Sequence, residues 1–244
     1  MKALILAAGY GIRLYPLTKD YPKPLLKVQD KAIIDYLIDK LDALDGLDEI
    51  IVVTNSKFIG QFRSWARKKR CLKKLTLIDD LTNSAATRRG AVGDINFVIN
   101  KKHVFADLLV IGGDNLFEGD LKEFIKFTKI HPHQPVIGVY RLKRLKDACN
   151  YGVVKLDKTN RVIDFKEKPK IPTSRLVAMC LYYFPKETLP FVGEYLKCKT
   201  TKHDATGCYI DWLRKKTAVY ALCFGKKWYD IGEHRFYQEA KEKF

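Results

Sequence analysis

A glycine-rich loop with a single arginine follows the first apolar segment of the chain. Residues 6–14 read Leu-Ala-Ala-Gly-Tyr-Gly-Ile-Arg-Leu, which places Gly9 and Gly11 shortly before Arg13. Glycines let backbone N–H groups approach an anion closely, and the guanidinium adds a planar fork of donors that suits phosphate. The loop is not a dinucleotide-binding fingerprint, because Leu14 occupies the third glycine position, and no Gly-Lys-Ser/Thr of a Walker A loop follows. We therefore predict that it binds phosphate in a site of another class.

This loop must be held by the elements around it, and the first half of the chain alternates apolar runs with helical patterns. Strands are predicted at residues 2–7, 49–54, 75–78, 108–111 and 136–140, and helices at 33–44, 58–70, 91–99 and 121–128. Strands separated by helices indicate βαβ units and a mostly parallel sheet. Ligands bind such sheets beyond the carboxyl ends of the strands, so we expect the site in the loops after Ala7 and Ile111.

The second half of the chain has a different pattern. A hairpin is predicted from residues 151–156 and 161–165 across a turn at 157–160, followed by a strand at 176–184. Helices at 187–196 and 209–215, a strand at 219–223 and a closing helix at 233–243 come next. Because neither a repeat nor a Gly/Ser linker separates the halves, we expect one α/β domain over residues 1–244, whose second half forms the far wall of the same site.

Composition indicates a chain that folds without staples. It has 244 residues, 47% of them hydrophobic, which is enough for a large core without a disulfide or a metal. No apolar run is long enough to span a bilayer, and the short apolar N-terminus lacks the cleavage site of a signal peptide. The six cysteines are scattered, without the spacing of a zinc site. We expect a cytoplasmic protein with reduced thiols and no membrane partner.

The net charge of +17 raises the hypothesis of a nucleic-acid partner. The basic residues are spread along the chain, however, and their densest clusters, at residues 67–70, 73–74 and 214–216, fall at predicted helix ends, where cations are favoured. No RRM, zinc-finger or helix-turn-helix signature is found in the sequence. We therefore favour a lysine-rich solvated surface that attracts anionic substrates, and expect no nucleic-acid partner.

The glycine-rich loop belongs to a longer pattern. The run Gly9-x-Gly11-x-Arg13-Leu14-x-Pro16-Leu17-Thr18, followed by Pro22-Lys23-Pro24-Leu25, resembles the signature of sugar-1-phosphate nucleotidyltransferases, a family that includes glucose-1-phosphate thymidylyltransferases and uridylyltransferases. Four further stretches resemble family motifs in the same order: Gly112–Phe117, Asn150–Val154, Phe165–Pro169 and Trp228–Gly232. The resemblance implies a three-layer α/β/α Rossmann-like fold with a mixed, mostly parallel sheet. Residues 1–140 would form its nucleotide-binding half, and residues 141–244 its sugar-binding half and closing helices.

The resemblance also implies a reaction, in which a sugar 1-phosphate oxygen attacks the α-phosphorus of a nucleoside triphosphate and pyrophosphate leaves. Mg²⁺ is the implied cofactor, because it takes one or two carboxylates together with phosphate oxygens. By the resemblance, the roles fall on four sets of residues: Asp114 and Asp230 as metal ligands; Arg13, Lys23 and Lys168 as catalytic groups; Ala8, Gly9, Gly11, Arg13, Lys23, Gly90 and Asp114 around the nucleotide; and Asn115, Tyr151, Gly152, Glu167 and Lys168 around the sugar. For Asn115, a helix cap is an equal alternative.

The chain departs from the family pattern at three places. Ile12 stands where a hydroxyl residue is usual, and Met179-Cys180 replaces a Thr-Gly pair near the sugar. In the base-binding loop the expected glutamine is missing; the residues that could replace it or approach the base are Asn83, Ser84, Arg88, Arg89, Gly90 and Ala91. The pattern favours dTTP or UTP as the nucleotide.

The leading hypothesis is therefore a glucose-1-phosphate thymidylyltransferase. One alternative is a uridylyl- or cytidylyltransferase that acts on another phosphorylated acceptor. Another is a catalytically idle relative that binds nucleotide sugars, a hypothesis motivated by Ile12 and the altered base loop. The implied partners are a nucleoside triphosphate and a sugar 1-phosphate, and homo-oligomer formation is left open.

Overall fold

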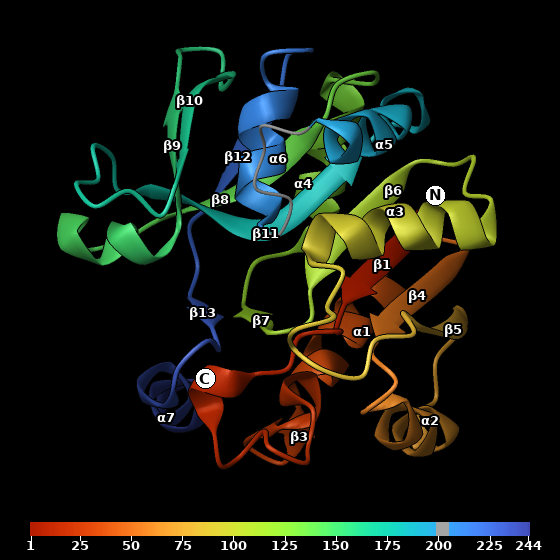
Figure 1. The fold of residues 1–244 in the computed structure, drawn as a ribbon. Helices are drawn as coiled ribbons and strands as arrows, with labels where there is room; N and C mark the ends of the chain where they lie inside the picture. The colour runs from red at the N-terminus through yellow and green to blue at the C-terminus, as the bar shows by residue number, and fades with distance from the viewer. Residues whose placement is uncertain (199–204) are drawn as a thin grey trace.

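The central feature of the computed structural model, which describes residues 1–198 and 205–244, is a mixed nine-stranded sheet (Figure 1). Seven strands follow one path in the order β10-β9-β11-β6-β1-β4-β5, while β8 pairs with β11 and β12. The strands are β1 (Lys2–Leu6), β4 (Glu49–Thr54), β5 (Lys74–Asp79), β6 (Leu108–Gly112), β8 (Val136–Arg141), β9 (Gly152–Leu156), β10 (Val162–Glu167), β11 (Leu176–Phe184) and β12 (Tyr220–Phe224).

Parallel pairing defines the first half of this sheet. Strand β1 pairs in parallel with β4 on one side and β6 on the other, and β4 pairs in parallel with β5. Strand β11 runs antiparallel to both β6 and β8, which joins the second half of the chain to the first. The predicted mixed α/β sheet is confirmed. The chain passes from β5 at one edge of the sheet to β6 on the other side of β1, so the order of the strands along the sequence reverses beside β1.

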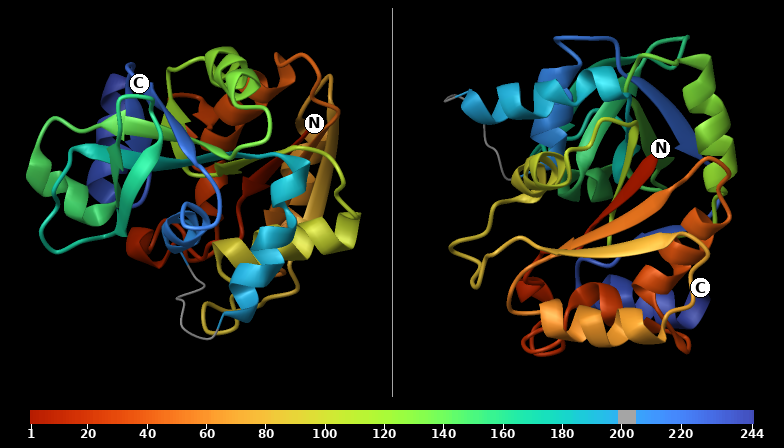
Figure 2. Two further views of the ribbon diagram at one scale, coloured as in Figure 1. Left: turned by 90° about the horizontal axis from the view of Figure 1, so that it is seen from above. Right: turned by 90° about the vertical axis from the view of Figure 1, so that its right-hand side faces the viewer.

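Helices cover both faces of the sheet, as the two views of Figure 2 show. Side chains alternate along β1, so Ala3 and Ile5 pack into one apolar cluster and Leu4 packs into another. The first cluster contains residues of α1 (Ile33–Asp42), α2 (Ile59–Lys68) and α4 (Leu121–Ile130). The second contains residues of α3 (Ala91–Lys102), α5 (Pro190–Lys197) and α6 (Thr206–Leu213). This is the three-layer arrangement that the resemblance implied.

A third apolar cluster connects the two ends of the chain. Helix α7 (His234–Lys243) contributes Tyr237 and Ala240, which pack with Leu14 and Val28 from the N-terminal loops. The hydroxyl of Tyr237 donates a hydrogen bond of 2.7 Å to the carbonyl of Lys27. The last helix therefore supports the loop that follows β1, as their neighbouring positions in Figure 1 indicate.

The structure differs from the sequence predictions mainly in short elements. The helix predicted at residues 187–196 begins at Pro190 after a single 3₁₀ turn, because proline is favoured in the first turn of a helix. The helix predicted at 209–215 begins earlier, at Thr206. Elements too short to show a period were not predicted: the strands β2 (Lys27–Val28), β3 (Lys31–Ala32), β7 (Asn115–Phe117) and β13 (Trp228–Asp230), and the 3₁₀ helices Ile12–Leu14, Lys23–Leu25 and Leu145–Asn150. Within the described ranges, no helix has the length and apolar character needed to cross a bilayer.

The buried carboxylate of Glu49 connects neighbouring elements of the fold. Glu49, at the start of β4, is 3% exposed, accepts a hydrogen bond of 2.7 Å from the Thr76 hydroxyl, and pairs with the ammonium groups of Lys2 and Lys102. Burial alone would raise the pKa of Glu49, but the hydrogen bonds from these three groups lower it to about 2. The ionised carboxylate therefore favours the folded state above the pKa that it has in the unfolded chain.

We expect Glu49→Gln to lower the free energy of unfolding by about 1–2 kcal/mol at pH 7, because two partly buried cations lose their counter-charge. The difference from wild type should shrink as the pH falls from about 5 towards 2, where Glu49 itself takes up a proton. Urea unfolding at pH 7 and pH 3 measures both values. The exposed Glu242→Gln is the control; a Glu49→Gln loss that is equal at both pH values would contradict the charge-based account.

Candidate active site

The carboxyl ends of β1 and β6 meet at one cavity. Leu6 and Gly112 are register partners in the parallel pair, and the N–H of Gly113 continues the pairing with a hydrogen bond of 2.9 Å to the Leu6 carbonyl. The loops after these strands line a cavity of about 390 Å³. Its lining consists of Leu6, Ala8, Gly9, Tyr10, Gly11, Ile12, Arg13, Lys23, Ala85, Arg88, Gly90, Ala91, Asp94, Gly112, Asp114, Cys180 and Gly232.

The turn after β6 requires a glycine at position 113. A Cβ atom there would lie 2.9 Å from the carbonyl oxygen of Leu6 and 3.2 Å from the ring of Pro24. Only a residue without a side chain lets the turn close this tightly against β1. The close approach brings Asp114, the next residue, to the wall of the cavity.

Two cations reach the cavity from short 3₁₀ helices of the N-terminal loop. Lys23 begins the helix Lys23–Leu25 between Pro22 and Pro24, and its ammonium group donates a hydrogen bond to the carboxylate of Asp114. Arg13 lies in the helix Ile12–Leu14, which follows Gly11 in the left-handed conformation, with φ of 62°. Because the Arg13 guanidinium is largely exposed, it can turn to a bound anion.

The far side of the guanidinium meets the C-terminal segment. Arg13 Nη1 lies 3.3 Å from Glu233 Oε1, and a Cβ atom on Gly232 would come within 3.1 Å of Arg13 Nη2. His234 Nε2 is 2.9 Å from the carbonyl oxygen of Tyr15. The segment before α7 therefore packs directly against the loop that carries Arg13.

Asp230 comes close to Asp114 from the other end of the chain, and is not itself in the cavity lining as the described residues define it. Strand β13 pairs antiparallel with β7 so that Asp230 is opposite Asn115, and the N–H of Ile231 donates to the Asp114 carbonyl at 3.1 Å. Burial and the charge of Asp114 raise the pKa of Asp230 to about 6, although Lys23, Arg13 and Lys168 act to lower it. The second carboxylate therefore lies within electrostatic range of the first and of three cations.

This pair of carboxylates has the donor chemistry that Mg²⁺ uses. Hard oxygen ligands suit the ion, and the mutual repulsion of Asp114 and Asp230 would be relieved by a divalent cation. In the part of the chain that the structure describes, no three His, Cys, Asp or Glu side chains gather as a metal site. A two-carboxylate site leaves the remaining positions to phosphate oxygens and water, which fits Mg²⁺ better than an ion that needs a full protein cage.

Asn115 has a role that the sequence did not suggest. The interpretation of this residue as a helix cap is wrong, because Asp120 caps α4 by accepting a hydrogen bond of 2.8 Å from the Lys122 N–H. The buried Asn115 amide instead accepts a hydrogen bond of 2.7 Å from the Trp228 indole N–H and donates one of 3.3 Å to the Cys180 carbonyl. It therefore joins β7, β13 and β11 directly behind the two carboxylates.

The predicted sugar-binding residues lie next to this joint. The rings of Tyr151 and Trp228 have centroids 5.3 Å apart, and the N–H of Lys168 donates to the Tyr151 carbonyl at 3.0 Å. Glu167 is opposite Gly152 in the hairpin, and burial raises the pKa of its carboxyl. As far as the described residues define it, the cavity lining contains none of Tyr151, Gly152, Glu167 and Lys168. The charge of Lys168 acts on Asp230, which lies beside Asp114, a residue of the cavity wall.

Gly152 has a packing reason to be glycine. A Cβ atom there would lie 2.4 Å from the Phe165 ring and 3.0 Å from Glu167 Oε2. The space beside this backbone is therefore taken by the protein itself. Close approach to a sugar ring, which the resemblance implied for Gly152, stays a prediction.

The opposite end of the cavity is formed by the loop before α3 and the first turn of that helix. Among the residues considered for base recognition, Arg88, Gly90 and Ala91 line the cavity, whereas Asn83 and Ser84 are exposed outside it. The Arg89 guanidinium is not in the lining either; it lies 4.2 Å from the centre of the Phe97 ring, and its Nε donates to the Asp80 carbonyl.

Some lining residues were not identified from the sequence. Tyr10, Asp94 and Gly232 belong to the lining without having been assigned a site role. Asp94 carried a signal: it is one helical turn after Gly90, in a stretch whose other core-facing residues are apolar. An acidic residue at that spacing beside a predicted loop site could have been placed in the cavity.

Comparison with known proteins assigns a family. The family model described as "Nucleotidyl transferase" matches residues 2–244. The bifunctional protein GlmU of Methanocaldococcus jannaschii is 30% identical over 233 residues, which cover 95% of this chain and 51% of that protein. The glucose-1-phosphate thymidylyltransferase of Neisseria meningitidis is 28% identical over 244 residues, which cover 98% of this chain and 81% of that enzyme.

Solved structures share the fold. A UDP-glucose pyrophosphorylase crystallised with UDP-glucose superposes with a TM-score of 0.81 at 21% identity, over 99% of this chain and 97% of that one. Other curated relatives carry the names of an adenylyltransferase and a guanylyltransferase. The chain spans about half the length of the GlmU relatives that it matches.

The closeness of Asp114 to Asp230 predicts that both side chains contribute to the affinity for a divalent cation. We expect Asp114→Asn and Asp230→Asn each to weaken Mn²⁺ binding by about tenfold or more, because each would remove one of the two carboxylates that we predict to bind the ion. Electron paramagnetic resonance of free Mn²⁺ during a titration, in the presence of pyrophosphate, measures the affinity. The exposed Asp45→Asn should bind as wild type does. Equal affinity in all three variants would exclude this pair as the metal site.

Proposed function

The chain belongs to the nucleotidyl transferase family, and from that premise we propose that it transfers a nucleotidyl group from a nucleoside triphosphate to a sugar 1-phosphate. The observation that carries the proposal is the grouping of Arg13, Lys23 and Asp114 in the wall of a single cavity, with Asp230 close enough for its charge to act on all three. Such a site can bring two phosphate compounds together and offset their charge.

The proposed reaction needs alignment and charge neutralisation. A phosphate oxygen of the sugar 1-phosphate forms a bond to the α-phosphorus, and the bond from that phosphorus to the pyrophosphate oxygen breaks. Negative charge increases on the leaving pyrophosphate, and Lys23 and Arg13, which line the cavity, would offset it. Gly9 and Gly11 line the same cavity and leave room for phosphate oxygens to approach the backbone.

Asp114 and Asp230 would hold Mg²⁺, the cofactor that we propose. When bound, the ion would neutralise phosphate charge, which is the chemistry that two carboxylates and two cations cannot supply alone. Lys23 has a second task beside it. Its ammonium group bonds to Asp114, so it holds that carboxylate in position at the wall of the cavity.

We place the sugar 1-phosphate on the side of Lys168. Its charge already acts on Asp230, so a phosphate bound between them would lie next to the proposed metal site. The half-buried Glu167 carboxylate can accept hydrogen bonds from sugar hydroxyls, and its raised pKa reflects the cost of leaving that carboxylate unsolvated. Tyr151 supports this side by packing on Trp228.

The identities of the nucleoside triphosphate and of the sugar 1-phosphate rest on separate observations. The sequence pattern favours glucose 1-phosphate with dTTP or UTP, and the printed names of relatives include a glucose-1-phosphate thymidylyltransferase and a UDP-glucose pyrophosphorylase. The names of an adenylyltransferase and a guanylyltransferase among other relatives indicate that the family accommodates several bases. The base is therefore decided by the side chains at the other end of the cavity.

Release of pyrophosphate by the purified protein tests the proposal. With Mg²⁺, five nucleoside triphosphates and a panel of sugar 1-phosphates that begins with glucose 1-phosphate, we expect one pair to give turnover. Asp114→Asn and Lys23→Met should lower kcat by about 100-fold or more, because each removes a charged group that contacts the reacting phosphates. Both variants should keep the wild-type circular dichroism spectrum.

The remote variant Asp45→Asn controls for the change of charge and should retain wild-type turnover. Turnover that survives in Asp114→Asn would remove that residue from the reaction centre. Nucleotide binding without pyrophosphate release from any pair would contradict the proposed transfer and favour an idle relative that binds nucleotide sugars.

A further inference from the structure

The cavity has a second charged feature, away from the two metal-site carboxylates. Asp94 lies in the first turn of α3, where its N–H donates to the Gly90 carbonyl at 2.9 Å, and it is part of the cavity lining. Only 5% of this residue is exposed. A carboxylate this deeply buried is costly to desolvate, so its presence in the wall of a binding cavity calls for a physical explanation.

A second carboxyl group lies behind it. The carboxyl groups of Asp80 and Asp94 are within hydrogen-bonding reach of each other, and burial raises the pKa of Asp80. Asp80 also accepts hydrogen bonds of 2.7 and 2.8 Å from the N–H and hydroxyl of Thr82, and that hydroxyl lies 3.1 Å from the hydroxyl of Tyr10. The acidic wall is thus held by a buried polar network rather than by a flexible surface chain.

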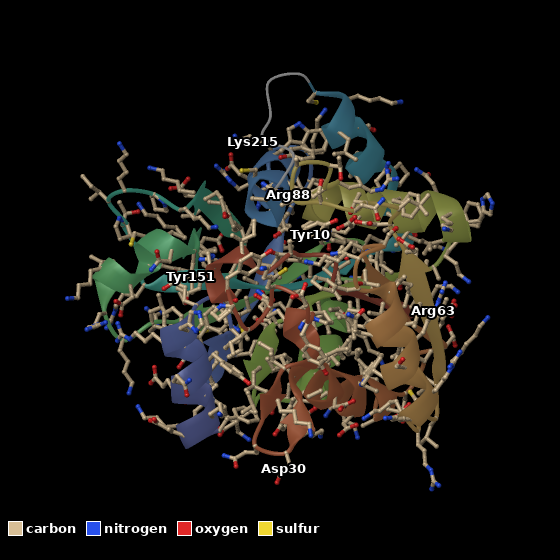
Figure 3. The ribbon with its side chains drawn as sticks, turned by 60° about the horizontal axis from the view of Figure 1, so that its bottom comes forward. Tyr10, Asp30, Arg63, Arg88, Tyr151 and Lys215 are labelled. Carbon is tan, nitrogen blue, oxygen red and sulfur yellow. The ribbon has the colours of Figure 1, made fainter. Side chains whose placement is uncertain are left out.

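The cavity therefore has two chemically different ends. The groups whose charges act on Asp230 are Asp114, Lys23, Arg13 and Lys168, whereas those that act on Tyr10 are Asp80, Asp94 and Asp79. The first end suits phosphates. A nucleotide bound there must extend its base elsewhere, and the cavity continues towards Tyr10, Arg88 and Asp94, of which Tyr10 and Arg88 are labelled in Figure 3.

Nucleobases differ in what their Watson–Crick edges offer to a carboxyl group. Uracil and thymine present a single N–H between two carbonyl oxygens, so one oxygen of a carboxylate would face a carbonyl. Guanine presents two neighbouring donors, N1–H and the 2-amino group, and the two oxygens of a carboxylate can accept one hydrogen bond from each. Cytosine and adenine present an exocyclic amino group, from which one oxygen of an ionised carboxylate can accept a hydrogen bond.

We propose that Asp94 is a specificity-determining residue that selects a nucleoside triphosphate whose base carries an exocyclic amino group. This inference rests on the proposed function, since it places the base of the donor nucleotide at this end of the cavity. It departs from the preference for dTTP or UTP that the sequence pattern favours. With either base, one oxygen of the buried Asp94 would face a carbonyl, which is a repulsive contact.

Other polar groups at this end do not offer the same selection. Tyr10 is engaged with Thr82, and Arg88 is an exposed residue whose Nη1 lies 3.3 Å from the Ala85 carbonyl. Backbone groups of Gly90 and Ala91 approach any base alike. Among the cavity-lining side chains of the described residues, Asp94 is the carboxylate at this end, so it sets which hydrogen-bonding edge is accepted.

Equilibrium binding tests the inference whether or not turnover occurs. Calorimetric titration with ATP, GTP, CTP, UTP and dTTP in Mg²⁺ should show the best amino base binding at least about tenfold more tightly than UTP or dTTP. Asp94→Asn exchanges one acceptor for a donor, so its carboxamide can accept from uracil N3–H and donate to O4. We expect the ratio of UTP affinity to that of the preferred amino base to rise by about tenfold.

Asp45→Asn, an exposed change of the same charge, should leave the ratio unchanged, and Asp94→Ala should remove the preference without favouring UTP. Loss of affinity for all bases in Asp94→Asn, with the ratio unaltered, would indicate a purely structural carboxylate and overturn the inference. Preference of the wild type for UTP or dTTP would also overturn it, while the proposed transfer could still hold. Selection of an amino base without pyrophosphate release would support it and contradict the transfer.

Discussion

Repulsion between two carboxylates is the constraint on which this site depends. Asp114 and Asp230 come from positions more than 100 residues apart, and burial together with the charge of Asp114 raises the pKa of Asp230. Backbone pairing of β7 with β13 supplies the geometry, and Lys23 supplies a counter-charge. The structure therefore concentrates negative charge at one place, as a site for a divalent cation would require.

Maintaining that pair draws on the whole chain. The turn at Gly113 closes against the end of β1, the indole of Trp228 bonds to Asn115, and α7 packs on the loop that carries Arg13. None of these contacts is local in sequence, so each depends on tertiary packing rather than on local secondary-structure propensity. Loss of α7 would therefore also disturb the phosphate end of the cavity, because α7 supports the N-terminal loop that carries Arg13.

The long elements could be predicted from the sequence because apolar residues recur along them with a helical or strand period. The three-residue strands β7 and β13 could not, since three residues show no period and their pairing partner is far away. Asn115 was open to a cap interpretation for the same reason: its true partner, Trp228, is 113 positions away. Asp94 was overlooked because an acidic residue on a predicted helix is ordinarily assigned to the solvated face.

The two ends of the cavity differ in how they are built, and this has a consequence for substrate choice. The phosphate end depends on backbone constraints, namely the tight turn at Gly113 and the prolines on both sides of Lys23. The other end depends on side chains from the loop before α3 and from the first turn of that helix. A helix tolerates exchange of such side chains without a change of backbone, so base selection can vary on a fixed scaffold for phosphate chemistry. We therefore interpret the buried Asp94 at this end as a residue that selects the base rather than as one that stabilises the fold.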